Sequence, residues 1–343
     1  MSHGSVSPRT SAYQPGLAWF SAVGSAWVFV LVAMGAFTTS IGAGMAFPDW
    51  PLSNGSLNPD GWLSDLAMFA EHSHRLSAGL MSAITLAIAV WLWRTESRRW
   101  LRLLATAAVV LIFVQALVGG LRVLLEHQRV NLIDTSVGRL FAMLHACLAQ
   151  LFVCNLAAIA AACSRPWLEP KPTTSHSVSP DLRRLGVVCC ALLVTQLGIA
   201  AVMRHSFAGL AIPTFPQSTP DGAWLPQTWD FRVAIQFAHR VMALALTVAI
   251  VTFATQLLRT ANLARGFKIV SVILLSLLAL QFYLGAAVVW SGRKPELTTA
   301  HVIVGAAILM ATFSITWFLH RDRIESQPSP QKSPRAVAAL TPA

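Results

Sequence analysis

Eight apolar stretches, each long enough to cross a lipid bilayer, follow one another along this chain. A helix needs roughly 20 apolar residues to cross about 30 Å of hydrocarbon. The stretches of this length are 17–40, 69–93, 103–125, 138–163, 185–205, 233–258, 269–291 and 298–319. Because 55% of the 343 residues are hydrophobic and only 11% are charged, a water-soluble fold and a disordered chain are both excluded. We therefore predict an all-α polytopic membrane protein with eight transmembrane helices.

The positive residues predict how these helices are oriented. Sixteen of the Lys and Arg residues lie at one end of the spans and only seven at the other. Since positive residues are retained on the cytoplasmic side, both termini are predicted to be cytoplasmic and the connectors 41–68 and 206–232 to face outward. The net charge of +11 is thus explained by topology, with no nucleic-acid partner. The first 16 residues resemble neither a signal peptide nor a transit peptide, which favours the bacterial plasma (inner) membrane.

The two halves of the chain repeat each other at an offset of about 165 residues. The matching motifs are Glu71-x-x-His74-Arg75 and Gln236-x-x-His239-Arg240, Gln115 to Gly120 and Gln281 to Ala286, and the single histidines His145 and His301. Four spans in each half predict two four-helix bundles related by a pseudo-twofold axis along the membrane normal.

This repeat divides the chain into five predicted parts. They are a cytoplasmic N-terminal tail (1–16), an N-terminal four-helix bundle (17–163), a cytoplasmic linker (164–184), a C-terminal four-helix bundle (185–320) and a disordered cytoplasmic tail (321–343).

One histidine lies near the outward end of each even-numbered span: His74, His145, His239 and His301. A single intramembrane histidine often serves only as a hydrogen bond between helices, but four at matched depth indicate a shared purpose. Two neutral imidazoles on facing helices can supply both axial ligands of a haem iron. A closed zinc site needs four ligands, and a di-iron site needs more carboxylates than this chain has there. We interpret the other six histidines as solvated.

Glu71 is the main difference between the halves, because Gln236 occupies the matching position. Glu71 and His74 are three residues apart on one helix face, so the carboxylate is predicted to point toward the same porphyrin as the imidazole. An ionisable group near the membrane interior is costly, which favours a catalytic or proton-handling role over a surface carboxylate.

Together, the motif Glu71-x-x-His74-Arg75, the loop 42–52 with Gly55, and the later histidines resemble the haem A synthase family over about residues 20 to 320. The resemblance implies oxidation of the C8 methyl of haem O to the formyl group of haem A, by successive hydroxylations, for terminal oxidases. It implies that His74 and His145 bind the substrate haem, with Glu71 catalytic, and that His239 and His301 are the axial ligands of a resident haem b. Arg75 and Arg240, beside these ligands, are candidates to pair with haem propionates, although interfacial arginines also extend to lipid headgroups.

The resemblance also implies partners. They are the lipid bilayer, haem O synthase, terminal oxidase assembly factors and an electron-transfer partner that the sequence does not identify; the oligomeric state stays open. Many bacterial members carry paired outward-loop cysteines, and this chain has none there. The main alternative is a di-haem b-type electron-transfer cytochrome, which gives no reason for a carboxylate in one half only. A transporter with inverted repeats is disfavoured because the repeat is parallel.

Overall fold

The computed structural model describes residues 9–130, 135–169 and 178–325, and within them eight helices are long and apolar enough to cross a membrane. The prediction of eight spans is therefore confirmed. Their bounds are α1 (Pro15–Ser40), α2 (Leu66–Thr95), α3 (Arg99–Leu124), α4 (Val137–Cys163), α6 (Pro180–His205), α7 (Phe231–Arg259), α8 (Arg265–Trp290) and α9 (Pro295–Leu319).

Equivalent side chains start the second helix of each half. The Asp65 carboxylate accepts a hydrogen bond from Met68 N at 2.8 Å and caps α2, and the Asp230 carboxylate accepts one from Val233 N at 2.7 Å and caps α7. Such a cap satisfies one of the amide groups that a helix leaves unpaired at its start. The local chemistry thus fixes both helix starts at matching places in the repeat.

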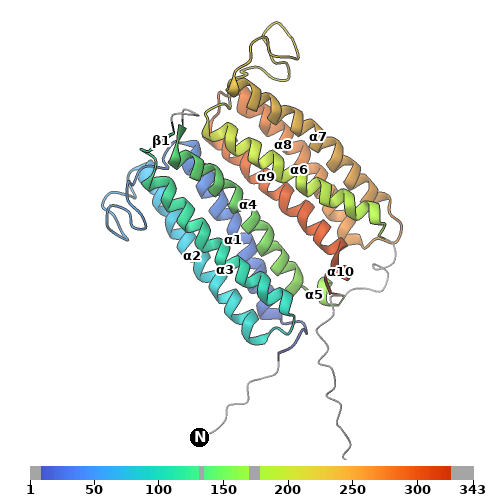
Figure 1. Ribbon diagram of the computed structural model, residues 1–343. Helices are drawn as coiled ribbons and strands as arrows, with labels where there is room; N and C mark the ends of the chain where they lie inside the picture. The colour runs from blue at the N-terminus through green and yellow to red at the C-terminus, as the bar shows by residue number, and fades with distance from the viewer. Residues whose placement is uncertain (1–8, 131–134, 170–177, 326–343) are drawn as a thin grey trace, which may run out of the picture.

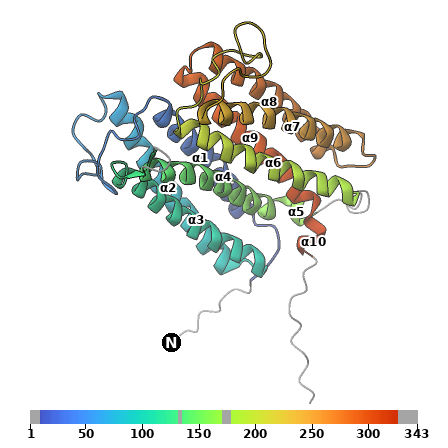
Figure 2. The same ribbon diagram turned by 45° about the horizontal axis from the view of Figure 1, so that its top comes forward.

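Each half is a square bundle whose consecutive helices are neighbours (Figure 1). In the first half α1 packs against α2 and α4, and α3 packs against α2 and α4, so α2 and α4 lie on a diagonal. In the second half α6, α7, α8 and α9 follow the same order, with α7 and α9 on a diagonal. The halves meet through α1 with α9, α4 with α6, and α4 with α9, so the first and last helices of each half form the interface (Figure 2). The pseudo-twofold axis itself stays a prediction.

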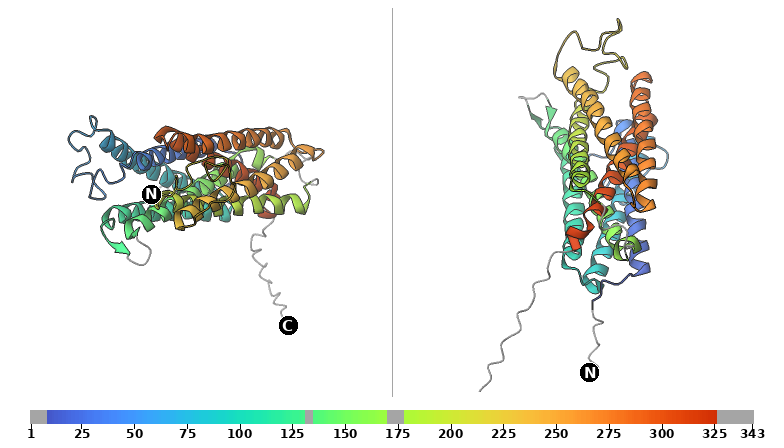
Figure 3. Two further views of the ribbon diagram at one scale, coloured as in Figure 1. Left: turned by 90° about the horizontal axis from the view of Figure 1, so that it is seen from above. Right: turned by 90° about the vertical axis from the view of Figure 1, so that its right-hand side faces the viewer.

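The molecule has two distinct ends, which we call the loop end and the base. The connections 41–65 and 206–230 and a hairpin of β1 (Arg129–Val130) with β2 (Thr135–Ser136) lie at the loop end (Figure 3). The base contains the α2–α3 connection, α5 (Arg165–Leu168) and α10 (Arg321–Glu325). Residues 321–325, predicted to begin a disordered tail, instead form α10; the rest of that tail, 326–343, lies outside the described residues. So do 1–8 of the N-terminal tail and 170–177 of the linker.

The largest cluster of apolar side chains in each bundle lies toward its base. The core of the first bundle includes Met81, Leu92 and Phe152, and that of the second includes Ile250 and Leu274. Met81, Phe152 and Ile250 each lie nearer the base than the histidine of their own helix. The main apolar core of each bundle therefore lies on the base side of its histidine pair.

A buried ion network closes the base. The Arg98 guanidinium donates to Glu96 at 2.8 Å, to Glu325 of α10 at 3.0 Å and to the Ala162 carbonyl at 3.1 Å, and the Trp167 indole also donates to Glu325. Burial alone would lower the pKa of Arg98, but hydrogen bonds to Glu96 and Glu325 and their charges raise it above its usual value. The network ties α10 to the first bundle.

Arg98→Gln is expected to lower the free energy of unfolding by about 3 kcal/mol, because it leaves the carboxylate of Glu96, 2% exposed, buried without its cation. Thermal unfolding of the detergent-solubilised protein, followed by tryptophan fluorescence, measures the effect. Arg99→Gln changes an exposed neighbour and is the matched control. Equal unfolding temperatures for the two variants would contradict a stabilising role for Arg98.

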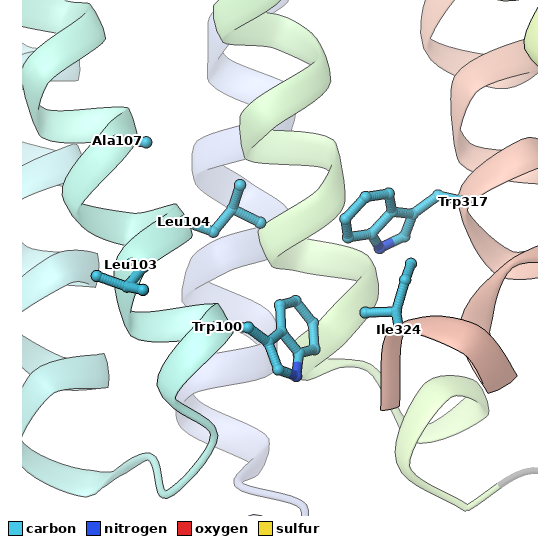
Figure 4. Close-up of a pocket in the computed structure, with 6 residues that line it drawn as sticks. All are labelled: Trp100, Leu103, Leu104, Ala107, Trp317 and Ile324. Carbon is cyan, nitrogen blue, oxygen red and sulfur yellow. The ribbon is translucent and has the colours of Figure 1, made fainter. Parts of the chain in front are cut away.

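An apolar groove of about 400 Å³ lies beside this network, between α3 and the α9–α10 segment (Figure 4). Its lining residues are Trp100, Leu103, Leu104, Ala107, Trp317 and Ile324. None of them is titratable, and the groove is at the base, so it is separate from the histidine pairs near the loop end.

Candidate functional site

His239 and His301 face each other inside the second bundle. Their rings, on the diagonal helices α7 and α9, have centroids 6.5 Å apart and planes inclined by 62°. The Gln196 amide donates to the His239 carbonyl at 3.0 Å, and the Gln281 amide nitrogen lies 3.3 Å from His301 Nε2. The structure thus brings together two imidazoles that the sequence places 62 positions apart.

His74 and His145 occupy the corresponding diagonal of the first bundle, on α2 and α4, within electrostatic range of each other. His145 Nδ1 is 3.1 Å from the Gln115 carbonyl, and the Gln115 amide returns a 2.8 Å hydrogen bond to the His145 carbonyl. A backbone partner of this kind orients an imidazole and selects its tautomer. The sequence motif Gln115 to Gly120 therefore acts as a support for His145.

Glycines line the helix surfaces opposite three of the four imidazoles. A Cβ atom at Gly35 would come within 2.8 Å of His74 Cε1, one at Gly119 within 2.9 Å of His145 Cε1, and one at Gly285 within 3.2 Å of His301 Cε1. Any side chain at the first two positions would force the ring to move. These positions leave room for the imidazoles, and Gly119 and Gly285 are equivalent in the repeat.

The residues present fit a haem in each bundle. The Nδ1 atoms of His74, His239 and His301 are buried and have no hydrogen-bond partner in the described part of the chain. Buried polar atoms are normally satisfied, so these orphaned atoms indicate rings organised for a ligand. Two imidazoles per bundle match the axial ligand set of a haem iron. No group of three or more His, Cys, Asp or Glu side chains suited to a metal occurs among residues 9–130, 135–169 and 178–325.

Glu71 is buried, only 4% exposed, and it joins α2 to the first long loop. One carboxylate oxygen accepts a hydrogen bond from Phe47 N at 3.1 Å, and the other pairs with the Arg75 guanidinium at 2.5 Å. The alternative of a surface carboxylate is therefore wrong. Both carboxylate oxygens of Glu71 are thus held, one by the loop backbone and one by the guanidinium group.

Gln236 makes the equivalent contacts in the second half. Its side-chain oxygen accepts a hydrogen bond from Ile212 N, and its amide donates to the Gly209 carbonyl at 2.9 Å and to the Ile212 carbonyl at 3.3 Å. Phe47 and Ile212 stand at the same offset as Glu71 and Gln236. Holding the loop is thus common to both halves, and the negative charge belongs to Glu71 alone.

Arg75 and Arg240 also hold the loops from matching positions. Arg75 donates to the carbonyls of Phe47, Asp49 and Leu52. Arg240 donates to those of Ile212, Thr214 and Gln217. These contacts engage most of the donors of both guanidinium groups, and the predicted pairing with propionates stays a prediction.

The first loop has its own internal support. The Asp49 carboxylate accepts hydrogen bonds from Asn54 N at 2.8 Å and Gly55 N at 2.7 Å, where both backbones adopt positive φ angles. Partial burial opposes ionisation, but these backbone donors and the charge of Arg75 outweigh it and lower the pKa of Asp49. The support is therefore present above the usual carboxyl pKa and is lost as the pH falls through the lowered value.

His72 is a functional candidate that the sequence interpretation missed. It is 3% exposed, not solvated, with Nδ1 3.0 Å from Ser53 Oγ and its ring 4.7 Å from the Trp62 ring centroid. The matching residue of the second half is Phe237. The only signal in the sequence was this second difference between the halves, directly beside Glu71.

Gly119→Ala is expected to weaken porphyrin binding in the first bundle about tenfold, because a new methyl group must displace the His145 ring and overpacking of this kind costs 1–3 kcal/mol. Titration of the purified protein with iron protoporphyrin IX, followed by its low-spin absorption, gives the dissociation constant. Gly198→Ala, where nothing lies within 4 Å of the added Cβ, should leave it unchanged. An equal effect of both substitutions would exclude the glycine as a determinant of ring position.

Fold and site together define a polytopic membrane protein with two helical bundles, each holding a pair of imidazoles beneath an ordered loop. Residues 18–313 match the sequence profile of the COX15-CtaA family, described as "Cytochrome oxidase assembly protein", and the chain belongs to this family.

Several similar proteins are bacterial and carry the name Heme A synthase. That of Bacillus licheniformis is 28% identical over 279 residues, 80% of this chain and 86% of the relative. That of Geobacillus kaustophilus is 27% identical over 335 residues, 93% and 95% of the two chains, and that of Halalkalibacterium halodurans is 24% identical over 314 residues, 89% and 97%. With the eight helices, these relatives confirm a multi-pass protein of the bacterial plasma membrane.

Proposed function

We propose that this protein is a haem A synthase, which oxidises the C8 methyl group of haem O to the formyl group of haem A. The observation that carries the proposal is the asymmetry of the two sites. Both bundles contain an imidazole pair, but only the first has a buried carboxylate beside it, at Glu71. The membership of the family and the names of the relatives support the same function.

The two bundles divide the work in this proposal. His74 and His145 bind substrate haem O in the first bundle, and His239 and His301 hold haem b in the second. When bound, haem b supplies one-electron transfer close to the substrate, as cofactors fixed in adjoining bundles can. The bundles share the interfaces of α1 with α9 and α4 with α6, which keeps the two sites in one rigid assembly.

Glu71 handles the proton in this proposal. Oxidation of a methyl group releases protons, and a carboxylate near the reacting carbon can accept one and stabilise developing positive charge. The Arg75 guanidinium and Phe47 N hold the Glu71 carboxylate at the loop end of the bundle. Arg75 thereby acts as a positioning residue for Glu71.

The loops act as covers. Arg75 and Arg240 fasten the two long loops to α2 and α7 through backbone carbonyls, and Trp50 of the first loop lies against Gly120 of α3. A fastened loop limits the access of water to the imidazole pair below it, which protects a reactive oxidation from side reactions. Haem O synthase, oxidase assembly factors and a separate electron-transfer partner are the partners that this function requires.

Expression in cells that make haem O but no haem A tests the proposal. We expect haem A in chromatograms of the extracted pigments only when this protein is present. A di-haem electron-transfer cytochrome would add b-type absorption to the membranes without any formyl haem. That outcome would replace the enzyme with the alternative function.

A further inference from the structure

In each half, one arginine side chain lies against a glycine of the long loop, and the two glycines are equivalent in the repeat. Arg122, at the end of α3, lies so close to Gly44 that a Cβ atom there would overlap its guanidinium group. Arg293, which follows α8, lies against Gly209, where a Cβ atom would meet its Cδ at 3.4 Å and its Nε at 3.7 Å. Gly44 and Gly209 match in the repeat, although the two arginines do not. Different sequence positions thus bring a positive charge to one equivalent place.

Neither guanidinium group is engaged by the protein. No hydrogen bond or ion pair joins the side chain of Arg122 or Arg293 to any residue within 9–130, 135–169 or 178–325, whereas the loop arginines Arg75 and Arg240 are bonded to backbone carbonyls. The N–H donors of both groups are therefore open to a ligand with oxygen acceptors.

The surroundings of Arg122 specify a negative ligand near the first imidazole pair. Its charge is within electrostatic range of His74 and His145. Arg122 also interacts electrostatically with Glu71 and Glu126. However, Glu71 forms an ion pair with Arg75, and Glu126 forms one with Arg139 at 3.5 Å. The nearby carboxylates are thus committed to other cations.

The second half has the same excess of positive charge. Arg293 lies within electrostatic range of Arg204, and Arg204 within range of His301. Arg204 donates to the Ala36 carbonyl and to Ser40 Oγ, each at 2.8 Å, which are neutral acceptors. Uncompensated charge in a medium of low dielectric constant is costly unless a counter-charge arrives.

The backbone at Arg293 is held in an unusual conformation. Its φ angle is 67°, directly after Gly292 at 66°, and a residue with a side chain rarely adopts this left-handed region. Such strain costs of order 1–3 kcal/mol and tends to persist where a side chain must be aimed. The turn carries the Arg293 side chain over the loop end of the second bundle.

We propose that Arg122 binds a propionate of the porphyrin in the first bundle and that Arg293 binds a propionate of the porphyrin in the second. The ligand class is a porphyrin dicarboxylate. The absence of a side chain at Gly44 leaves room for the Arg122 guanidinium, whereas Arg293 only packs beside Gly209. Arg75 and Arg240 hold the long loops through backbone carbonyls, and their own pairing with propionates stays a separate prediction. The assignment of one porphyrin to substrate and the other to resident haem rests on the proposed function.

Porphyrin esters test the first half of this proposal. Protein that retains its resident haem is titrated with iron protoporphyrin IX or with its dimethyl ester, and binding is followed by low-spin absorption. The wild type should bind the diacid about tenfold more tightly than the ester, the usual scale for one charge-assisted hydrogen bond. Arg122→Gln should bind both with the lower affinity, and Arg122→Lys should restore part of the preference.

The second half is tested by the resident haem. Arg293→Gln should lower its midpoint potential, since a nearby positive charge favours the reduced iron, and should leave the ester preference of the first bundle intact. Arg232→Gln, an exposed change at the loop end, is the control for both measurements. Equal weakening of diacid and ester in Arg122→Gln, or no weakening, overturns the role of Arg122; an unchanged potential overturns that of Arg293. Haem A formation enters neither readout, so failure of the proposed enzyme activity is recognised separately.

Discussion

Glu71→Gln is expected to keep both porphyrins bound while haem A formation per folded protein falls by about 100-fold, the usual scale for a positioned acid or base. The second half of the molecule explains why the fold should survive. Gln236 holds its loop through Ile212 N with a neutral amide, so a glutamine at position 71 can hold the loop through Phe47 N in the same way. The substitution therefore removes the charge and leaves the anchor.

Haem A is measured by chromatography of extracted pigments, with the reduced absorption spectrum of the same sample as the measure of bound porphyrin. Glu126→Gln removes another carboxylate of the loop end, one that pairs with Arg139, and should retain normal turnover. If Glu71 were only a loop anchor, Glu71→Gln would lose bound porphyrin or folded protein, and turnover would fall only in proportion. Near-normal turnover would remove Glu71 from the chemistry.

The transmembrane helices could be predicted because lipid imposes one simple demand, a long apolar run with its backbone bonded internally. The predicted helix starts are wrong where the first turn of a helix is polar. Helix α3 starts at Arg99 and α6 at Pro180, several residues before the predicted apolar windows at 103 and 185. Those turns lie at the base, where a charged side chain can reach water, so hydrophobicity does not mark where the helix begins.

The candidate ligands could be predicted because equal depth is a one-dimensional property once the spans are known. Each candidate histidine lies near the loop end of the second or fourth long helix of its half, and the structure places these helices on the diagonals of the bundles. The histidines are His74, His145, His239 and His301. The repeat strengthened this prediction, since the same histidine positions could be compared between the two halves. No structure of the loops was needed for this step.

The roles of the arginines could not be predicted, because they depend on the folded path of the loops. Proximity in sequence to the histidines made Arg75 and Arg240 candidates for propionates, and the structure adds that carbonyls about 25 positions upstream accept hydrogen bonds from them. Arg122 and Arg293 belong to none of the repeated motifs, and only the folded loop brings Gly44 and Gly209 against them. The burial of His72 has the same origin, since Ser53 and Trp62 belong to the loop that covers it.

His239→Ala or His301→Ala is expected to abolish the low-spin α-band of the reduced protein and to reduce haem A formation to background. Each substitution removes one of the two imidazoles that face each other in the second bundle, and a low-spin haem iron needs both as ligands. His74→Ala should differ in one respect, because it removes a substrate ligand. It should retain the α-band of the resident haem while turnover is lost.

This contrast between the bundles separates the enzyme from a carrier with two equivalent haems. Absorption spectra and haem A content are measured on the same membranes, and His127→Ala, an exposed histidine of the loop end, is the control. Free imidazole added to His239→Ala should restore part of the α-band, since the substitution leaves a cavity where the ring was. An unchanged spectrum in both His239→Ala and His301→Ala would exclude this pair as ligands. Equal loss of the α-band in His74→Ala and His239→Ala would mean that the bundles bind their porphyrins alike, and the asymmetry at Glu71 would then need another explanation.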